Sequence, residues 1–310
     1  MPRPRTASAR PLTSLTRGPT LDRPAHQRLW LASAREDSRS IATVNGVWLA
    51  YEISGTGDIP LVMVHGSFES RRTWDGVVPY LADRFRVLTY DLRGYGESGQ
   101  SRGQGGIHDH VAHLAALVEH VELAPAWVVG QFGGAEISLR LAGERPDLLR
   151  GVIAHEPGEM SLVADDPAVA PMLEDVSQLI AEVVEQIESG DHAGAVERFC
   201  EQALGDGTWA RLPPWFRQDV VDNTPNTVND LTDSQGAAFD LEWVREFTRP
   251  ALLTVGDQTA PIFPPIITKL AEAMPAAEVR EFTGAGHVIQ ADQPESFAEA
   301  IDAFVRKHTA

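Results

Sequence analysis

The sequence predicts an α/β protein in which a mostly parallel β-sheet is flanked by helices and carries an inserted helical cap. Short apolar runs alternate with helical periods along most of the chain, and this alternation is typical of parallel sheets covered on both faces. Strand-like runs stop between about residues 160 and 245, a stretch too long for an ordinary loop. A chain of 310 residues is long enough for both a core and a cap.

The core elements follow in order from residue 41. A hairpin comes first, because residues 41–44 and 47–53 flank Asn45-Gly46, a strong two-residue turn signal. Buried strands are then predicted at residues 60–64, 87–90, 127–129, 152–155, 251–255 and 278–282. Helical periods fall between them, at residues 74–82, 111–121, 137–144, 266–273 and 296–305. We therefore expect the core to comprise residues 41–159 and 246–310.

The cap is expected to span residues 160–245 and to be helical. Apolar side chains recur at helical spacing in residues 173–187, and a further helix is predicted from Pro213-Pro214 toward Leu231. A cap over the strand ends would close an apolar cavity and exclude water. Candidates either for the cavity lining or for the core are Trp209, Trp215 and Phe216.

Charge is distributed unevenly along the chain. The net charge is −18, but residues 1–40 alone carry a balance of +5, which leaves −23 for the remainder. A body that acidic repels phosphates, so no nucleic-acid partner is expected. Residues 1–40 lack the apolar region of a secretory signal and are interpreted as a disordered leader, with a targeting presequence or a basic docking arm as alternatives.

Apolar runs and cysteine content indicate the expected environment. No apolar run approaches the roughly 18 residues of a membrane helix, so we expect a soluble, cytoplasmic protein with no membrane partner. Cys200, the only cysteine, suits a reducing compartment and is expected to pack inside a helix. His108, His110 and His113 raise the question of a metal, but they open a predicted helix on which near neighbours diverge. We expect no metal and no cofactor, and the oligomeric state stays open.

Four stretches, in order, resemble the α/β-hydrolase superfamily. Residues 60–64 lead into His65-Gly66, like the strand and turn that supply an oxyanion-hole amide. Residues 86–98 resemble the next strand and its Asp-x-Arg-Gly-x-Gly-x-Ser loop, and residues 127–134 resemble the strand and nucleophile elbow. Gly286-His287 matches the turn that holds the family's catalytic histidine. The ordered set implies the α/β-hydrolase fold over residues 41–310.

The elbow departs from the family at its reactive position. An intact elbow reads Gly-x-Ser-x-Gly, with the serine on a strained turn between strand and helix. Counting from Gly130, Phe132 occupies the serine slot; counting back from Gly133-Gly134, Gln131 occupies it. Neither a phenyl ring nor a neutral amide can attack a carbonyl, and losing the serine of a triad costs on the order of 10⁶ in turnover. The resemblance therefore implies a member without the usual nucleophile.

The remaining machinery is expected to be a histidine and its carboxylate. His287 would act as general acid or base, because an imidazole titrates near neutrality. The family's acid position after the strand at residues 251–255 holds Thr259, so Glu156, at a second family acid position, is expected to orient His287. Asp257 is the alternative orienting group.

These residues predict acid/base catalysis without a covalent intermediate, by a lyase, isomerase, cyclase or water-mediated hydrolase. The substrate would be a small apolar or aromatic metabolite, with Phe132 as a wall of its cavity. Amides around Ser67, Phe68 and Gly133 would stabilise an oxyanion or enolate. Two alternatives stay open: a catalytically inactive ligand-binding or interaction protein, and an esterase with a displaced serine, Ser67.

Overall fold

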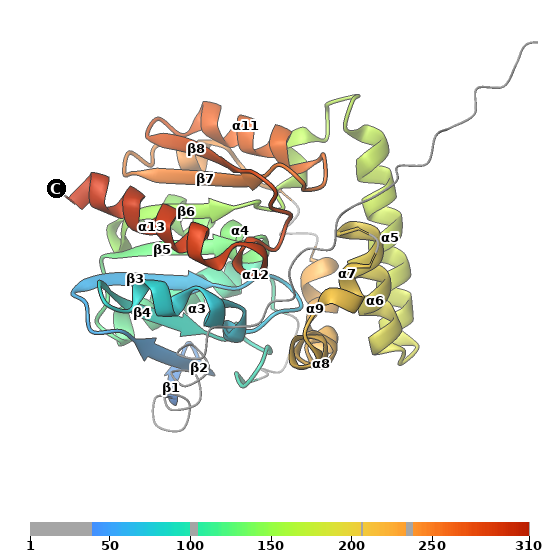
Figure 1. Ribbon diagram of the computed structural model, residues 1–310, viewed down its shortest axis with the longest axis horizontal. Helices are drawn as coiled ribbons and strands as arrows, with labels where there is room; N and C mark the ends of the chain where they lie inside the picture. The colour runs from blue at the N-terminus through green and yellow to red at the C-terminus, as the bar shows by residue number, and fades with distance from the viewer. Residues whose placement is uncertain (1–38, 100–104, 206, 234–237, 310) are drawn as a thin grey trace, which may run out of the picture. The chain divides into compact units, whose positions relative to one another are not determined.

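An eight-stranded sheet forms the centre of the computed structural model, in the order β1-β2-β4-β3-β5-β6-β7-β8 (Figure 1). The structure describes residues 39–99, 105–205, 207–233 and 238–309. β1 (Arg39–Val44) and β2 (Val47–Ser54) pair antiparallel across Asn45 and Gly46, which both adopt positive φ. β1 begins two residues before the expected start of the core, and the predicted leader otherwise lies outside the described residues.

The other strands make the fold mostly parallel, as predicted. β2 pairs antiparallel with β4, and every later neighbouring pair is parallel. The strands are β3 (Ile59–Val64), β4 (Phe85–Tyr90), β5 (Ala126–Gln131), β6 (Leu149–His155), β7 (Ala251–Gly256) and β8 (Ala277–Phe282). β3 to β7 are short runs of largely buried apolar residues, which is the pattern of a sheet covered on both faces. The buried strand expected at residues 278–282 is wrong in its burial, because β8 is an edge strand and only Phe282 in it is buried.

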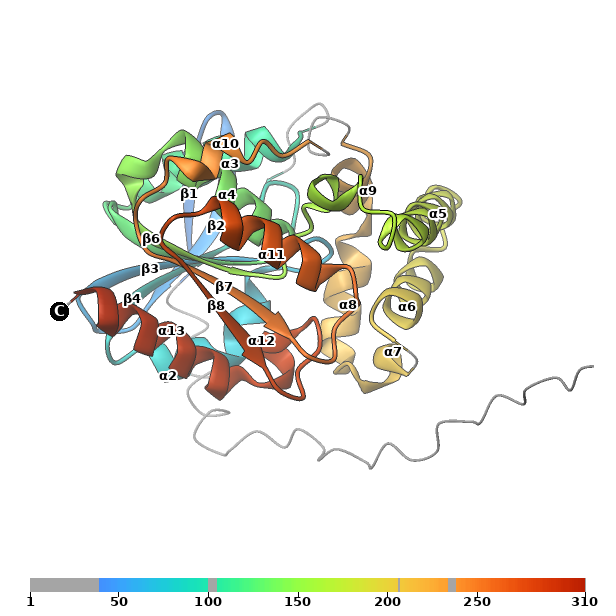
Figure 2. The same ribbon diagram turned by 90° about the horizontal axis from the view of Figure 1, so that it is seen from above.

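Helices cover both faces of the sheet (Figure 2). One face carries α3 (Ile107–His120), α4 (Gly133–Glu144), α10 (Glu242–Arg245) and α11 (Phe263–Ala273). The other carries α2 (Val78–Leu81), α12 (Ile289–Asp292) and α13 (Pro294–Thr309). The helix expected at residues 74–82 is divided into a 3-10 turn, η1 (Arg71–Gly76), and α2. Two further 3-10 turns are η2 (Pro146–Leu148) and η3 (Met160–Val163).

The cap helices lie between β6 and β7 in sequence and beside the sheet in space (Figure 1). They are α5 (Ala170–Glu188), α6 (His192–Ala203), α7 (Thr208–Arg211), α8 (Pro214–Asp222) and α9 (Thr224–Leu231). Phe216 and Cys200 pack in the cap's own buried cluster, with Trp209 and Trp215 against it. Burial raises the pKa of the Cys200 thiol to about 12, which suits a packing role.

The single helix expected from Pro214 to Leu231 is wrong, because the chain breaks at Asn223 into α8 and α9. The Asn223 side chain donates hydrogen bonds to the carbonyls of Phe68 (3.1 Å) and Glu69 (2.9 Å), which follow β3. Pro225, in the first turn of α9, has no amide hydrogen to continue α8. The break therefore ties the cap to the loop after β3.

Two searches of the described residues bear on membranes and metals. No helix among them is both long and apolar enough to cross a membrane. Within the same residues, no group of three or more His, Cys, Asp or Glu side chains is arranged to hold a metal ion. His108 and His110 have different partners: His108 pairs with Glu144 (3.4 Å) and His110 with Asp230 (3.3 Å).

Candidate active site

The turn between β5 and α4 places Phe132 in a strained conformation, with φ 47° and ψ −115°. The turn needs small neighbours: a Cβ on Gly130 would lie 2.2 Å from the Gly134 carbonyl oxygen. A Cβ on Gly134 would lie 2.1 Å from that of Val64. Gln131 still belongs to β5, so of the two possible registers the turn residue is Phe132. Such a conformation costs on the order of 1 to 3 kcal/mol and persists only where the surroundings enforce it.

His287 and Glu156, which are far apart in sequence, are hydrogen-bonded. The Nδ1–H of His287 donates to Glu156 Oε2 at 2.6 Å. Glu156 follows β6 and is fully buried, and its other oxygen accepts the Gly256 amide at 2.8 Å. Burial alone would raise the pKa of this carboxyl, but the hydrogen bond and charge of His287 bring it below its usual value. The carboxylate thus fixes the orientation and tautomer of the imidazole.

Residues after β7 show why Glu156 is the partner. Thr259, at the family's other acid position, donates its hydroxyl to Glu156 Oε2 at 2.7 Å. Asp257 is exposed and accepts the Gly284 amide at 2.7 Å. The alternative acid is therefore not hydrogen-bonded to His287, whereas the threonine supports the carboxylate that is.

Gln131 occupies the second nitrogen of His287. Its Nε2 lies 3.2 Å from His287 Nε2, so both imidazole nitrogens have partners within the chain. The Gln131 side chain is buried, and its Oε1 has no hydrogen-bond partner among the described residues. The sequence drew attention to Gln131 only as an alternative turn residue, and no sequence signal indicated this contact.

Two aromatic rings cover His287. Phe263 stacks on the imidazole with ring centroids 4.8 Å apart, and Phe132 meets it edge-on at 5.2 Å. Phe132 also lines a cavity, whereas His287 is not among the residues that line it. The Phe132 ring therefore lies between the histidine and this cavity.

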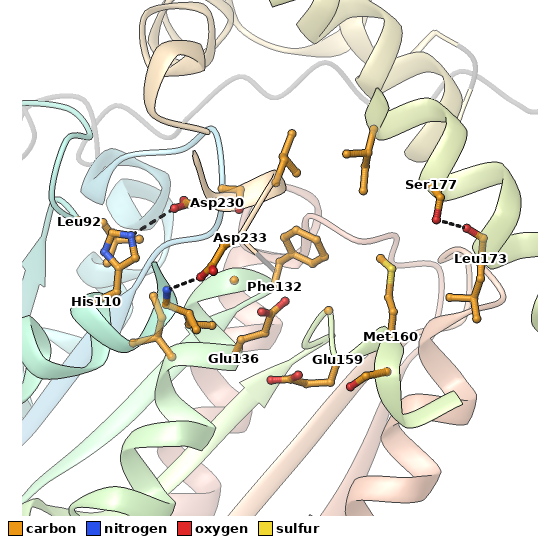
Figure 3. Close-up of a pocket in the computed structure, with 18 of the residues that line it drawn as sticks. Leu92, His110, Phe132, Glu136, Glu159, Met160, Leu173, Ser177, Asp230 and Asp233 are labelled. Atoms are coloured by element: carbon orange, nitrogen blue, oxygen red, sulfur yellow. Dashed lines mark hydrogen bonds and ion pairs between the residues drawn. The ribbon is translucent and has the colours of Figure 1, made fainter. Parts of the chain in front are cut away.

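The cavity has a volume of about 410 Å³ and lies between α4 and the cap (Figure 3). This volume falls within the range of roughly 300 to 1,000 Å³ that small-molecule sites occupy. Most of its walls are apolar, and its polar groups are mainly carboxyl groups. The side chains that line it include Leu92, Ile107, His110, Phe132, Glu136, Ile137, Glu159, Met160, Leu173, Ile180, Asp230, Leu231 and Asp233.

Two of the three expected oxyanion-hole residues open into this cavity. Ser67 and Gly133 both line it, and a Cβ on Gly133 would lie 3.6 Å from the Ser67 nitrogen. Across the residues that the structure describes, neither backbone amide has an acceptor. The expectation for Phe68 is wrong, because its amide donates to Thr227 Oγ1 of α9 at 3.2 Å. Its ring instead packs against Phe199 of the cap.

Within the described part of the chain, neither Ser67 nor Ser138 is hydrogen-bonded to His287. Ser138 donates to the Gly134 carbonyl at 2.6 Å and is buried within α4. Ser67 lies at the cavity, while His287 Nε2 is engaged by Gln131. A serine hydroxyl needs such a base to become a nucleophile.

Comparisons with known proteins identify the family of the chain. The family described as alpha/beta hydrolase fold matches residues 59–294. A dihydrolipoyllysine-residue acetyltransferase component of an acetoin cleaving system from Pseudomonas putida is 28% identical over 83% of this chain and 66% of the relative. A haloalkane dehalogenase from Bradyrhizobium diazoefficiens is 33% identical over 36% of each chain. The chain thus spans two thirds or less of the length of these two relatives.

A solved structure is similar over nearly its whole length. An esterase from Thermogutta terrifontis, solved with malate bound, superposes with a TM-score of 0.72 and 25% identity. The match covers 88% of this chain and 99% of the esterase. Together with the family match over residues 59–294, these likenesses show that the chain belongs to the α/β-hydrolase-fold family.

Proposed function

We propose that the chain is an enzyme that acts on a small, largely apolar or aromatic molecule by acid/base chemistry without a covalent intermediate. The observation that carries this proposal is Phe132, which holds the strained turn position and lines the cavity beside two open backbone amides. A benzyl group has no lone pair to attack a substrate, so the residue at the turn can only shape the cavity and exclude water from it.

The amides of Ser67 and Gly133 supply the electrostatic part of the proposed mechanism. Gly133 is the first residue of α4, so its amide points outward from a helix N-terminus. Preorganised amides of this kind stabilise negative charge that develops on a carbonyl oxygen or an enolate. They suit lyase, isomerase, cyclase and water-mediated hydrolysis steps equally.

His287 supplies the proton transfer in this proposal, under a geometric condition. Glu156 holds the Nδ1 side, so only Nε2 can exchange a proton with a substrate. Gln131 occupies Nε2, and a substrate atom must replace its amide before transfer occurs. The reaction therefore requires a local movement of both Gln131 and the Phe132 ring.

Conversion of a natural metabolite tests the proposal. A metabolite extract from a host lacking the gene is incubated with the purified chain and followed by mass spectrometry. We expect one small apolar compound to disappear and a product to form, and we expect His287→Ala to abolish the conversion. Ser138→Ala, a buried serine outside the cavity lining, serves as the control and should retain activity. A chain that changes no compound contradicts the enzymatic proposal.

A second candidate function is ligand binding without turnover. It is favoured by the satisfied state of His287, both of whose nitrogens are bonded within the chain. The same extract distinguishes the two functions. A compound that copurifies with the chain unchanged, and that cavity substitutions such as Ile137→Trp displace, supports the binding protein.

A further inference from the structure

The cavity lining carries an excess of acidic groups. Its carboxyl side chains are Glu136, Glu159, Asp230 and Asp233, and its one basic side chain among the described residues is His110. Most other lining residues are apolar or are small residues such as serine and glycine. A ligand that complements this cavity is therefore apolar over most of its surface and is not an anion.

All four carboxyl groups have partners in the fold. Glu159 forms a buried ion pair with Arg140. Asp230 accepts hydrogen bonds from the Tyr95 hydroxyl and from His110, the latter at 3.3 Å (Figure 3). Asp233 accepts the Ile107 amide at 2.9 Å. These contacts position structural elements around the cavity. Glu136 is the fourth carboxyl group, and it adjoins Phe132.

Glu136 faces the cavity from the first turn of α4, beside Phe132 (Figure 3). Among the described residues it forms no ion pair, and its contact is the backbone amide of Gly158. Burial and the neighbouring charge of Glu159 raise the pKa of its carboxyl group to about 8, although the nearby Arg140 charge acts in the opposite direction. A cation bound at this carboxylate would offset both unfavourable effects.

The Phe132 ring and the Glu136 carboxyl group both pack against Gly158, so they are neighbours on one wall of the cavity. A Cβ placed on Gly158 would lie 2.4 Å from Glu136 Oε1 and 2.7 Å from Phe132 Cε2. A carboxylate in the wall of a mostly apolar cavity can pair with an ammonium group, while the neighbouring ring contacts the apolar body of the same ligand. The residue that blocks covalent chemistry thereby becomes part of a binding site.

We infer that the cavity binds an apolar or aromatic amine, whose ammonium group pairs with Glu136 beside the Phe132 ring. This inference rests on the proposed function, since it names the substrate class of the same cavity. The apolar body of the amine packs against the cap side of the cavity, where Leu173 and Ile180 of α5 lie. A primary amine is protonated near pH 7, because its pKa resembles that of lysine, about 10.4.

Matched pairs of amines and alcohols test the inference. Binding of 2-phenylethylamine and 2-phenylethanol, and of tryptamine and 3-(2-hydroxyethyl)indole, is measured by calorimetry on the full chain. Each pair has the same apolar body, so a difference reports the charged group. We expect the amine of at least one pair to bind about tenfold more tightly than its alcohol.

Two variants assign the preference to one side chain. In Glu136→Gln, which keeps the shape of the side chain, we expect the amine preference to disappear while alcohol affinity stays within about twofold. Glu144→Gln is the matched control, because Glu144 ends the same helix and is exposed outside the cavity. It should retain the preference. Circular dichroism establishes that both variants fold.

The outcomes separate this inference from the proposed function. Alcohols that bind as tightly as amines, or a preference that survives Glu136→Gln, overturn the amine inference and leave the cavity's role intact. If neither class binds to the wild-type chain, both the amine inference and the proposed small-molecule role of the cavity fail.

Discussion

The two sides of Phe132 differ in how far their polar groups are satisfied. On one side, His287 is bonded to Glu156 and Gln131 and covered by Phe263. On the other, the amides at the cavity have no acceptor among the described residues, and Glu136 has no ion pair there. This difference indicates that the imidazole is held and covered within the fold, whereas the amides already face the cavity.

The largest expected effect comes from replacing the ring that divides the two sides. In Phe132→Ser a hydroxyl stands at the strained turn, with the Ser67 and Gly133 amides already open. We expect hydrolysis of p-nitrophenyl acetate to rise from background to about 10³-fold over the uncatalysed rate. Adding His287→Ala to this variant should remove the histidine's part of the gain. A variant that stays inert would show that the amides cannot hold an oxyanion.

Removing the buried Glu156 carboxylate should destabilise the His287 side of the site. Glu156→Ala leaves His287, Thr259 and the Gly256 amide without their acceptor. We expect the free energy of unfolding, measured with urea, to fall by about 3 to 5 kcal/mol. Asp257→Ala, the neighbouring exposed carboxylate, should cost only about 1 kcal/mol. Equal losses would mean that Glu156 is no more important to the fold than a surface group.

Removing the Gln131 contact tests whether this side chain covers His287. Gln131→Met keeps the side-chain length but removes the amide from His287 Nε2. We expect a stability loss of about 1 to 3 kcal/mol and faster modification of His287 by diethylpyrocarbonate. Gln178→Met, on the exposed face of α5, should change stability by less than about 0.5 kcal/mol. An unchanged modification rate would contradict the role of Gln131 as a cover.

The two glutamates should give opposite pH dependence. The pKa of Glu156 is lowered in the fold, so its stabilisation is present above the unfolded pKa and is lost as the pH falls through the folded pKa. The pKa of Glu136 is raised, so stability is lost as the pH rises toward its folded value.

Stability curves of two variants measure these signs. Relative to wild type, Glu136→Gln should gain stability as the pH rises from about 5 to 8, by on the order of 1 kcal/mol. Glu156→Gln should lose most above the unfolded pKa and approach wild type in acid. Curves with the same sign for both variants would contradict the difference between the two sides.

The core was predictable because its signals are local. The parallel strands other than β8 are short apolar runs, and Asn45-Gly46 specifies the hairpin turn on its own. The Gly-rich turn before His287 and the position of Glu156 also lie within short motifs. These features need no knowledge of distant residues.

The pairing of Glu156 with His287 followed from the family resemblance, but distant contacts outside the family's motifs could not be predicted. Gln131 and His287 are 156 positions apart, and nothing in either segment indicates a hydrogen bond between them. The break at Asn223 depends on carbonyls of the β3 loop, and the same contacts bring Thr227 to the Phe68 amide. The sequence identifies Glu136 only as a residue of a helix, because the cavity beside it is formed by distant segments.

Covalent labelling tests most directly whether the wild-type chain lacks a nucleophilic serine. The wild-type chain and Phe132→Ser are incubated with a fluorophosphonate, and their intact masses are compared. We expect no adduct on the wild-type chain and one adduct, at position 132, on the variant. An adduct on the wild-type chain, at Ser67 or elsewhere in the cavity, would contradict this expectation.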